Sequence, residues 1–386
     1  MFEVPSEASG ILPIQWLRKA AEDGAILSEM GEIPAANFQP ASLDLRLGEK
    51  AYRLRCSFLP GKHRVQEKLA EYALDEFDMS VGAILESNRP YLIPLMEQLC
   101  LPDYLRGKCN PKSSTGRLDV FTRVITDHCH RFDEINPGYQ GALYLEVVPR
   151  SFTIKVHSGL SLNQLRLIKG LEQCDDGELA EAHHGDPIIF APGGHPQPVE
   201  LVINDGLLLS VDLIGDGKGV IGYKAKKNSE LIDLSRTAYY DAVDFWEPIY
   251  GDRKPRLVLE PEEFYLLLSY EYVRIPPRFA GEMIALDPTS GEFRTHYAGF
   301  FDPGFGYGAG GELTGTRAVM EVRAHDVPFM VENLQRVCKL KFERMLEPPD
   351  VLYGVEIGSS YYDQGLRLSK HFHPKTLPQR PQLPLL

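Results

Sequence analysis

The densest group of potentially functional side chains lies in residues 111–117, with the sequence PKSSTGR. Hydroxyl groups, backbone N–H groups and the two cations Lys112 and Arg117 fall within these seven residues. This concentration of hydrogen-bond donors and fixed positive charge suits the binding of a polyphosphate. The segment is not a Walker loop, because that motif leads into a helix, whereas residues 118–126 are rich in branched side chains and predict a β-strand.

A carboxylate, Glu146, interrupts the apolar segment ALYLEVV at residues 142–148, which predicts a second strand after a turn at 135–141. Burying a carboxylate in such a segment is costly unless the group is paired or used in chemistry. We therefore predict that Glu146 is the acid–base residue. The structural alternative is that Glu146 forms an ion pair with Arg117 or Arg123.

The composition excludes several classes of function. A chain of 386 residues with 43% hydrophobic content can bury a large core, and its length suggests two domains. A net charge of −13 argues against binding to nucleic acid or to an anionic membrane, so an anionic ligand needs a locally basic pocket. No apolar segment reaches membrane-spanning length and the N-terminus lacks the features of a secretory signal, so we expect a cytoplasmic protein.

The cysteines do not indicate a disulfide framework or a metal cage. They are scattered and form no Cys-x-x-Cys pair, so buried or idle thiols are expected. The group His128-Cys129-His130 could bind a metal, but no further ligands follow at a fixed spacing, so we interpret it as a polar loop.

The second half of the chain repeats the first. Four motifs recur in the same order at an offset of about 170 residues. They are 101–107 with 275–281, 42–45 with 210–213, 136–139 with 302–305, and Glu146 with Glu321. This pattern predicts a tandem duplication of one all-β unit, with a first repeat at 1–170, a linker at 171–198 and a second repeat at 199–386.

The ordered motifs SLDLRLG, PKSSTGR, NPGYQG and LEV resemble the dCTP deaminase branch of the trimeric dUTPase family. The resemblance extends over nearly the whole chain, once in each half. It implies two distorted jelly-roll β-barrels, a homo-oligomer with threefold symmetry, and nucleotide sites between neighbouring barrels. It also implies that dCTP is the substrate and dUTP the product, and it suggests dTTP as an inhibitor.

The resemblance assigns roles to individual residues. Ser113 and Arg117 match the family's serine and arginine at the phosphates and the reacting base, and Glu146 matches its general base and acid. Lys112 stands where arginine is common, which keeps the charge and loses the bidentate fork. Asn136 stands where aspartate is usual. Because an amide cannot accept a proton, the first repeat looks unsuited to diphosphohydrolase chemistry.

A C-terminal tail is expected to close over the nucleotide. By spacing, Tyr353, Ser360 and Gln364 resemble the family's tyrosine, lysine and glutamine, so serine in place of lysine leaves one phosphate contact unassigned. No such tail follows the first repeat, so we expect it to cover a site built mainly from first-repeat residues. The complete set of expected substrate-binding residues is Lys112, Ser113, Ser114, Arg117, Asn136, Tyr144, Tyr353 and Gln364.

The expected chemistry is hydrolytic loss of ammonia from cytosine, with one carboxylate moving the protons. The His-x-Glu and Pro-Cys-x-x-Cys signature of zinc deaminases is absent, so we expect no zinc. Mg²⁺ is expected only as the counter-ion of the substrate triphosphate, with no protein side chain as its ligand.

The second repeat leaves alternatives open. Ser290 and Arg294 keep the spacing of the first-repeat loop, but an acidic residue, Glu292, lies between them, so we expect this copy to be mainly structural. A mixed site that combines Ser113 and Arg117 with Glu321 is the other arrangement. Two further functions stay open, namely a dUTP diphosphatase or bifunctional deaminase that uses Asp302, and a nucleotide-binding regulator without turnover.

Overall fold

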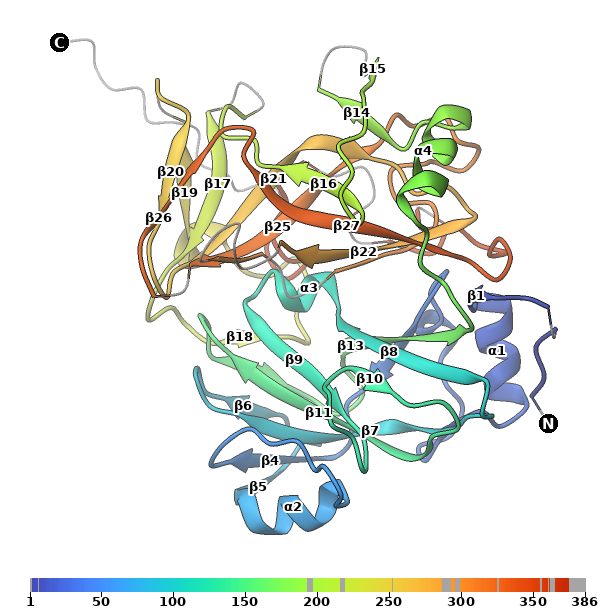
Figure 1. Cartoon of the computed structure of the whole chain (residues 1–386). Coiled ribbons are helices and arrows are strands. Elements are labelled where there is room, and N and C mark those ends of the chain that lie inside the picture. Colours follow the sequence, from blue (N-terminus) through green and yellow to red (C-terminus); the bar gives the residue numbers. More distant parts are fainter. Residues whose placement is uncertain are drawn as a thin grey trace.

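The computed structural model describes residues 2–374 except for 6, 193–196, 216–218, 252, 287–292, 296–298, 325, 355, 360 and 362–364. The described chain is mainly β and consists of antiparallel sheets with a few short helices (Figure 1). No helix in the described ranges is long and apolar enough to cross a membrane.

The first half contains the following elements, in chain order. They are β1 (Gly10–Ile11), α1 (Ile14–Glu22), β2 (Ile26–Ser28), β3 (Leu43–Arg46), β4 (Lys50–Leu54), α2 (Val65–Tyr72), β5 (Ala73–Asp78), β6 (Ala83–Leu85), β7 (Tyr91–Cys100), β8 (Leu105–Pro111), α3 (Ser113–Gly116), β9 (Val120–Ile125), β10 (Glu134–Ile135), β11 (Gln140–Pro149), β12 (Ile154–Val156) and β13 (Ser161–Lys169).

The second half begins with a helix and continues with strands. Its elements are α4 (Asp176–Gly185), β14 (Ile189–Ala191), β15 (Gln197–Pro198), β16 (Leu207–Ser210), β17 (Val220–Ala225), β18 (Ile232–Asp233), α5 (Ala242–Phe245), β19 (Trp246–Tyr250), β20 (Arg256–Leu259), β21 (Phe264–Val273), β22 (Phe279–Ala285), β23 (Phe293–Thr295), β24 (Phe300–Phe301), β25 (Thr316–Ala324), β26 (Phe329–Glu332) and β27 (Arg336–Arg344).

The two halves share one strand order. In the first half β3 and β8 both pair with β13, β8 also pairs with β10, and β7, β11 and β9 lie in sequence in a second sheet. In the second half β16 and β22 both pair with β27, β22 also pairs with β24, and β21, β25 and β23 lie in sequence. The sequence repeats therefore correspond to repeated sheet topology.

Strand composition follows the burial of the sheets. Strand β8 alternates buried and half-buried residues along its whole length, as expected for a strand with one face on a core. Strand β25, with the sequence TRAVMEVRA, is buried at every position, including its two arginines and its glutamate. A carboxylate in each of the strands β11 and β25 is thereby placed inside the protein.

The junction between the halves combines a shared apolar core, in which Phe152 packs on Trp246, with buried polar contacts. Strands β8 and β13 lie below β22 and β27, and α3 points into the same region (Figure 1). Arg166 on β13 is fully buried and its Nη1 donates to the Glu343 carboxylate at 2.7 Å and to Gly281 O at 3.0 Å. Lys108 on β8 also pairs with Glu282. Because these charges are satisfied only by the other half, the ion pairs fix how the halves sit on each other.

Three local expectations differ from the structure. Segment 171–198, expected to be a linker, contains α4, whose capping box uses Asp175 and Glu178, and β14, which pairs with β21. Residues 52–79 have a mixed pattern that predicts only short strands and loop, and the structure adds helix α2 there. The prolines of residues 85–101 predict a strand pair, but residues 91–100 form one long strand, and Pro94 lies next to a register shift in the pairing with β11.

Candidate active site

The 112–117 loop is a single helical turn between two strands. Strand β8 ends at Pro111 and α3 begins at Ser113, and the turn is closed by hydrogen bonds from Gly116 N–H to Lys112 O at 3.0 Å and from Arg117 N–H to Ser113 O at 3.1 Å. Its side chains line a cavity of about 290 Å³. The loop therefore presents hydroxyl groups and cations to an enclosed space.

The opposite wall of this cavity comes from the second half of the same chain. Asp302, Phe305, Val319 and Glu321 line it, and the last two lie on β25. The approach between the walls is close at Gly116, where an added Cβ would lie 2.6 Å from the carboxyl carbon of Glu321. The glycine thus leaves room for a carboxylate beside the loop.

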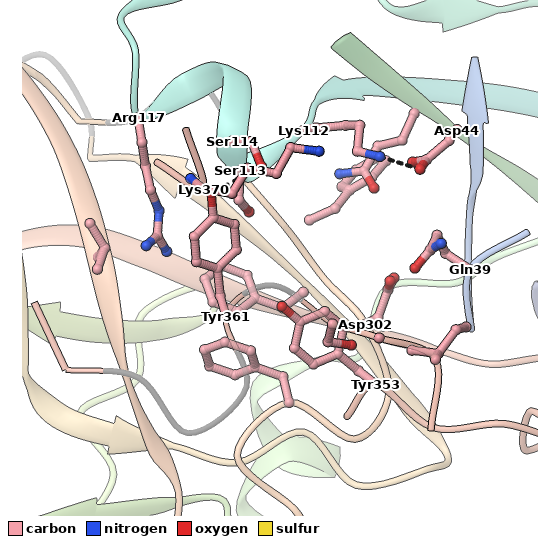
Figure 2. A pocket seen from close by; sticks show the side chains of 18 of the residues that line it. Gln39, Asp44, Lys112, Ser113, Ser114, Arg117, Asp302, Tyr353, Tyr361 and Lys370 are labelled. Atoms are coloured by element: carbon pink, nitrogen blue, oxygen red, sulfur yellow. Dashed lines mark hydrogen bonds and ion pairs between the residues drawn. The ribbon is translucent and has the colours of Figure 1, made fainter. Parts of the chain in front are cut away.

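The C-terminal tail forms the third side. Tyr353, residues 357–359, Tyr361 and Lys370 all line the cavity, and Figure 2 shows the labelled tyrosines and Lys370 gathered around the loop. The Tyr361 hydroxyl donates to Ser114 Oγ at 2.9 Å. The Ser369 hydroxyl donates to Ser114 O at 2.8 Å. The tail is therefore hydrogen-bonded directly to the first-repeat loop.

Arg117 connects the tail to the loop through two kinds of contact. Its guanidinium lies 3.8 Å from the centre of the Tyr361 ring and donates from Nη1 to Arg367 O at 2.7 Å. Burial lowers the pKa of Arg117, and the carboxylate of Glu321 opposes this shift. A guanidinium remains charged even with such a shift, so Arg117 is a fixed cation in the cavity.

Two further carboxylates contribute to the electrostatics. Asp44 forms an ion pair with Lys112, drawn as the dashed line in Figure 2, and burial raises the pKa of its carboxyl group. Burial likewise raises the pKa of Asp302, whose Oδ1 accepts from Arg166 Nη2 at 3.3 Å. The cavity thus holds cations and carboxylates close together, an arrangement suited to an anionic ligand and to proton transfer.

The structure brings together most, but not all, of the predicted site residues. Lys112, Ser113, Ser114, Arg117 and Tyr353 line the cavity as expected. Gln364 lies outside the described residues, as do Ser290 and Ser360, while Arg294 belongs to β23 and its side chain is not described.

Asn136 and Tyr144 lie elsewhere. Asn136 is exposed in the turn after β10, and Tyr144 packs in a small separate core cluster next to α2. Neither lines the cavity. Their assignment as substrate-binding residues therefore stays a prediction.

Glu146 also lies elsewhere. It is fully buried on β11, pairs across the sheet with Arg123, and accepts from Arg123 Nε at 3.0 Å. Arg123 is further held by Ser57 and by the ring of Phe132, 3.6 Å from its guanidinium carbon. The structure thus shows the ion pair with Arg123 that the sequence analysis gave as the alternative, and Glu321, rather than Glu146, lines the cavity beside the 112–117 loop of this chain.

Sequence reasoning missed Asp44, Tyr361 and Lys370 as cavity residues. Asp44 lies in the repeated SLDL motif, so the repeat was a usable signal. Tyr361 and Lys370 belong to no motif, and only the folding of the tail onto the first half places them there.

The fold and the cavity define a duplicated, mainly β protein with a charged site between its halves. The model of the 2'-deoxycytidine 5'-triphosphate deaminase N-terminal domain matches residues 8–171, and the model of the C-terminal domain matches residues 175–372. The crystal structure of 2'-deoxycytidine 5'-triphosphate deaminase from Agrobacterium tumefaciens superimposes with a TM-score of 0.83 at 46% identity, covering 91% of this chain and 100% of that one. The chain therefore belongs to the dCTP deaminase family.

Shorter curated relatives match part of the chain. The dCTP deaminase of Natronomonas pharaonis is 27% identical over 133 residues, which span 34% of this chain and 65% of that protein. The dUMP-forming dCTP deaminase of Methanothermobacter thermautotrophicus is 26% identical over 138 residues, 36% of this chain and 67% of that protein. The second name thus specifies dUMP as the product, and the first specifies no product.

Proposed function

We propose that the chain converts dCTP and water to dUTP and ammonia in the cavity between its halves. The observation that carries this proposal is the position of Glu321, a buried carboxylate on β25, directly beside the loop that carries Ser113 and Arg117. Family membership supports the choice of substrate.

The proposed chemistry needs one group that moves protons. Glu321 takes a proton from water as its oxygen adds to C4 of the cytosine ring, and delivers that proton to N3. The C4 hydroxyl of the tetrahedral intermediate then gives its remaining proton to the same carboxylate, which passes it to the amine. The C4–N bond breaks, ammonia leaves, and the C4 carbonyl of uracil forms. Arg117 and Ser113 orient the attacking water and polarise the ring, and the closed tail limits the entry of bulk water.

The phosphates are proposed to lie along the loop. Lys112, Ser113 and Ser114 offer one ammonium and two hydroxyl groups, and the Asp44 carboxylate neutralises Lys112 until an anion arrives. Mg²⁺ is proposed to enter with the triphosphate as part of the substrate. Among the described residues no group of three or more His, Cys, Asp or Glu side chains is placed to hold a metal ion.

A second candidate function is formation of dUMP and pyrophosphate by a further hydrolysis at the same site. Asp302 favours this candidate, because it lines the cavity and offers a carboxylate where the first repeat has Asn136. Several relatives carry the name dUMP-forming. Incubation of the purified chain with dCTP and Mg²⁺, followed by anion-exchange chromatography, distinguishes dUTP from dUMP.

The decisive experiment compares two matched substitutions, Glu321→Gln and Glu146→Gln. We expect Glu321→Gln to lower kcat by about 10²- to 10⁴-fold, because the amide cannot carry the proton. Glu146→Gln keeps the size of a buried side chain away from the cavity and should leave kcat within about threefold, at a cost in stability. Equal losses of kcat in both variants would contradict the role of Glu321.

Finer features of the family also remain proposals for this chain. These are the distorted jelly-roll form of each barrel, threefold assembly, a cytoplasmic location and inhibition by dTTP. Light scattering coupled to size-exclusion chromatography tests the assembly. Titration of dTTP into the deamination assay tests the inhibition.

A further inference from the structure

Lys370 is a lysine whose backbone is fixed against the loop that carries Ser114. Its N–H donates to the Tyr361 hydroxyl at 3.1 Å, and its carbonyl accepts from Ala238 N–H at 2.9 Å. The neighbouring Ser369 side chain donates to Ser114 O. The segment is thus held from both halves of the chain, and the position of the Lys370 Cα is set by the site.

The ammonium group of Lys370 lacks a matching counter-charge. It lines the cavity, is half-buried, and has no hydrogen-bond or ion-pair partner within the part of the chain that the structure describes. Burial and repulsion by Lys112 lower the pKa of Lys370, and attraction to Asp44 only partly offsets them. A desolvated ammonium without a partner is costly, so its retention needs an explanation.

The local charge balance points to an anion. Lys112 and Lys370 are both within electrostatic reach of the Asp44 carboxylate, which already pairs with Lys112. The Asp302 carboxylate also interacts with Lys112, but it is paired with Arg166. Figure 2 shows Lys370 beside Ser113 and Ser114. An incoming phosphate would supply the missing negative charge and find both hydroxyl groups as donors.

We propose that Lys370 binds the phosphate tail of the substrate and supplies the cation that Ser360 cannot. This inference rests on the proposed function, and it assigns the phosphate contact to a residue ten positions further along the tail. Because the Lys370 N–H donates to the Tyr361 hydroxyl, which in turn donates to Ser114, the same contact would connect the bound triphosphate to the tail.

The test uses Lys370→Met, Lys370→Arg and a matched control, Lys62→Met, which removes an exposed lysine of the first half. We expect Lys370→Met to raise KM for dCTP about 10- to 100-fold and to leave kcat within about threefold, because a charged contact to the bound substrate is lost. Lys370→Arg should recover most of the affinity, and Lys62→Met should match the unmodified chain. The KM of Lys370→Met should also depend less on salt.

A second readout separates a phosphate contact from a structural role. Inorganic triphosphate, used as a competitive inhibitor, should lose affinity by a similar factor in Lys370→Met, whereas the inhibition constant of deoxycytidine, which carries no phosphate, should change by less than threefold. Equal effects on dCTP and deoxycytidine, or an unchanged KM for dCTP, would overturn the role of Lys370. Absence of any dCTP turnover in the unmodified chain would instead overturn the proposed function.

Discussion

Substitution of Gly116 by alanine should separate activity from stability. An ideal Cβ at this position would lie 2.6 Å from the Glu321 carboxyl carbon, whereas ordinary contact begins at 3.4 Å. The carboxylate must therefore retreat by about 0.8 Å, which it can do because it is the end of a flexible side chain. A misplacement of about 1 Å in a reacting group costs roughly 10²-fold in rate, so we expect kcat for dCTP to fall by about that factor.

The same substitution should cost little in folding. Gly116 has a helical conformation in α3 with no positive φ, and alanine favours a helix over glycine by about 1 kcal/mol. The assay pairs steady-state deamination with urea unfolding, and Gly185→Ala in α4 is the control, because nothing lies within 4 Å of its added Cβ. Full turnover in Gly116→Ala would refute the reasoning that Glu321 is held in its reacting position beside the loop.

Three further predictions concern the contacts around the site. Replacing Arg166 by methionine removes the hydrogen-bonded partner of the buried Glu343 carboxylate, so we expect the free energy of unfolding, measured with urea, to fall by about 3–5 kcal/mol. A decrease below about 1 kcal/mol would contradict this. Burial lowers the pKa of His371 to about 4 from 6.5, so between these pH values the imidazole takes up a proton when the protein unfolds. The free energy of unfolding should therefore fall by up to about 3 kcal/mol as the pH falls from 6.5 to 4, and His371→Gln should remove this part of the measured pH dependence. An unchanged pH dependence in the variant would contradict the prediction. Tyr361→Phe removes the hydrogen bond to Ser114, which should lower the free energy of unfolding by about 1 kcal/mol and raise KM for dCTP several-fold in the deamination assay. An unaltered KM would show that the tail covers the cavity without this hydrogen bond.

The sequence predicted the mainly β fold and the duplication because both depend on local pattern. Alternating and branched residues mark strands such as β9 and β11, and the repeated motifs keep the strand order of the sheets. Helix α2 was missed because it has eight residues and its N-cap residue, Arg64, makes no capping hydrogen bond; the Val65 N–H instead donates to Asp127, which is 62 residues away in sequence.

The loop that lines the cavity was predictable, and the carboxylate opposite it was not. Lys112, Ser113 and Arg117 are neighbours in sequence, so their cooperation is a local property. Glu146 and Glu321 are equivalent in the repeats and both lie in buried strands, so no local pattern distinguishes them. Which of the two carboxylates lies beside the loop depends on how the halves pack against each other, and buried ion pairs such as Arg166 with Glu343 help to fix that packing.

Both walls of the cavity belong to one chain, so dilution of the protein does not separate them. The loop with Ser113 and the strand with Glu321 meet at an effective concentration fixed by their covalent connection, so this cavity stays complete at any protein concentration at which the chain is folded. A cavity shared between separate chains would instead come apart below their dissociation constant.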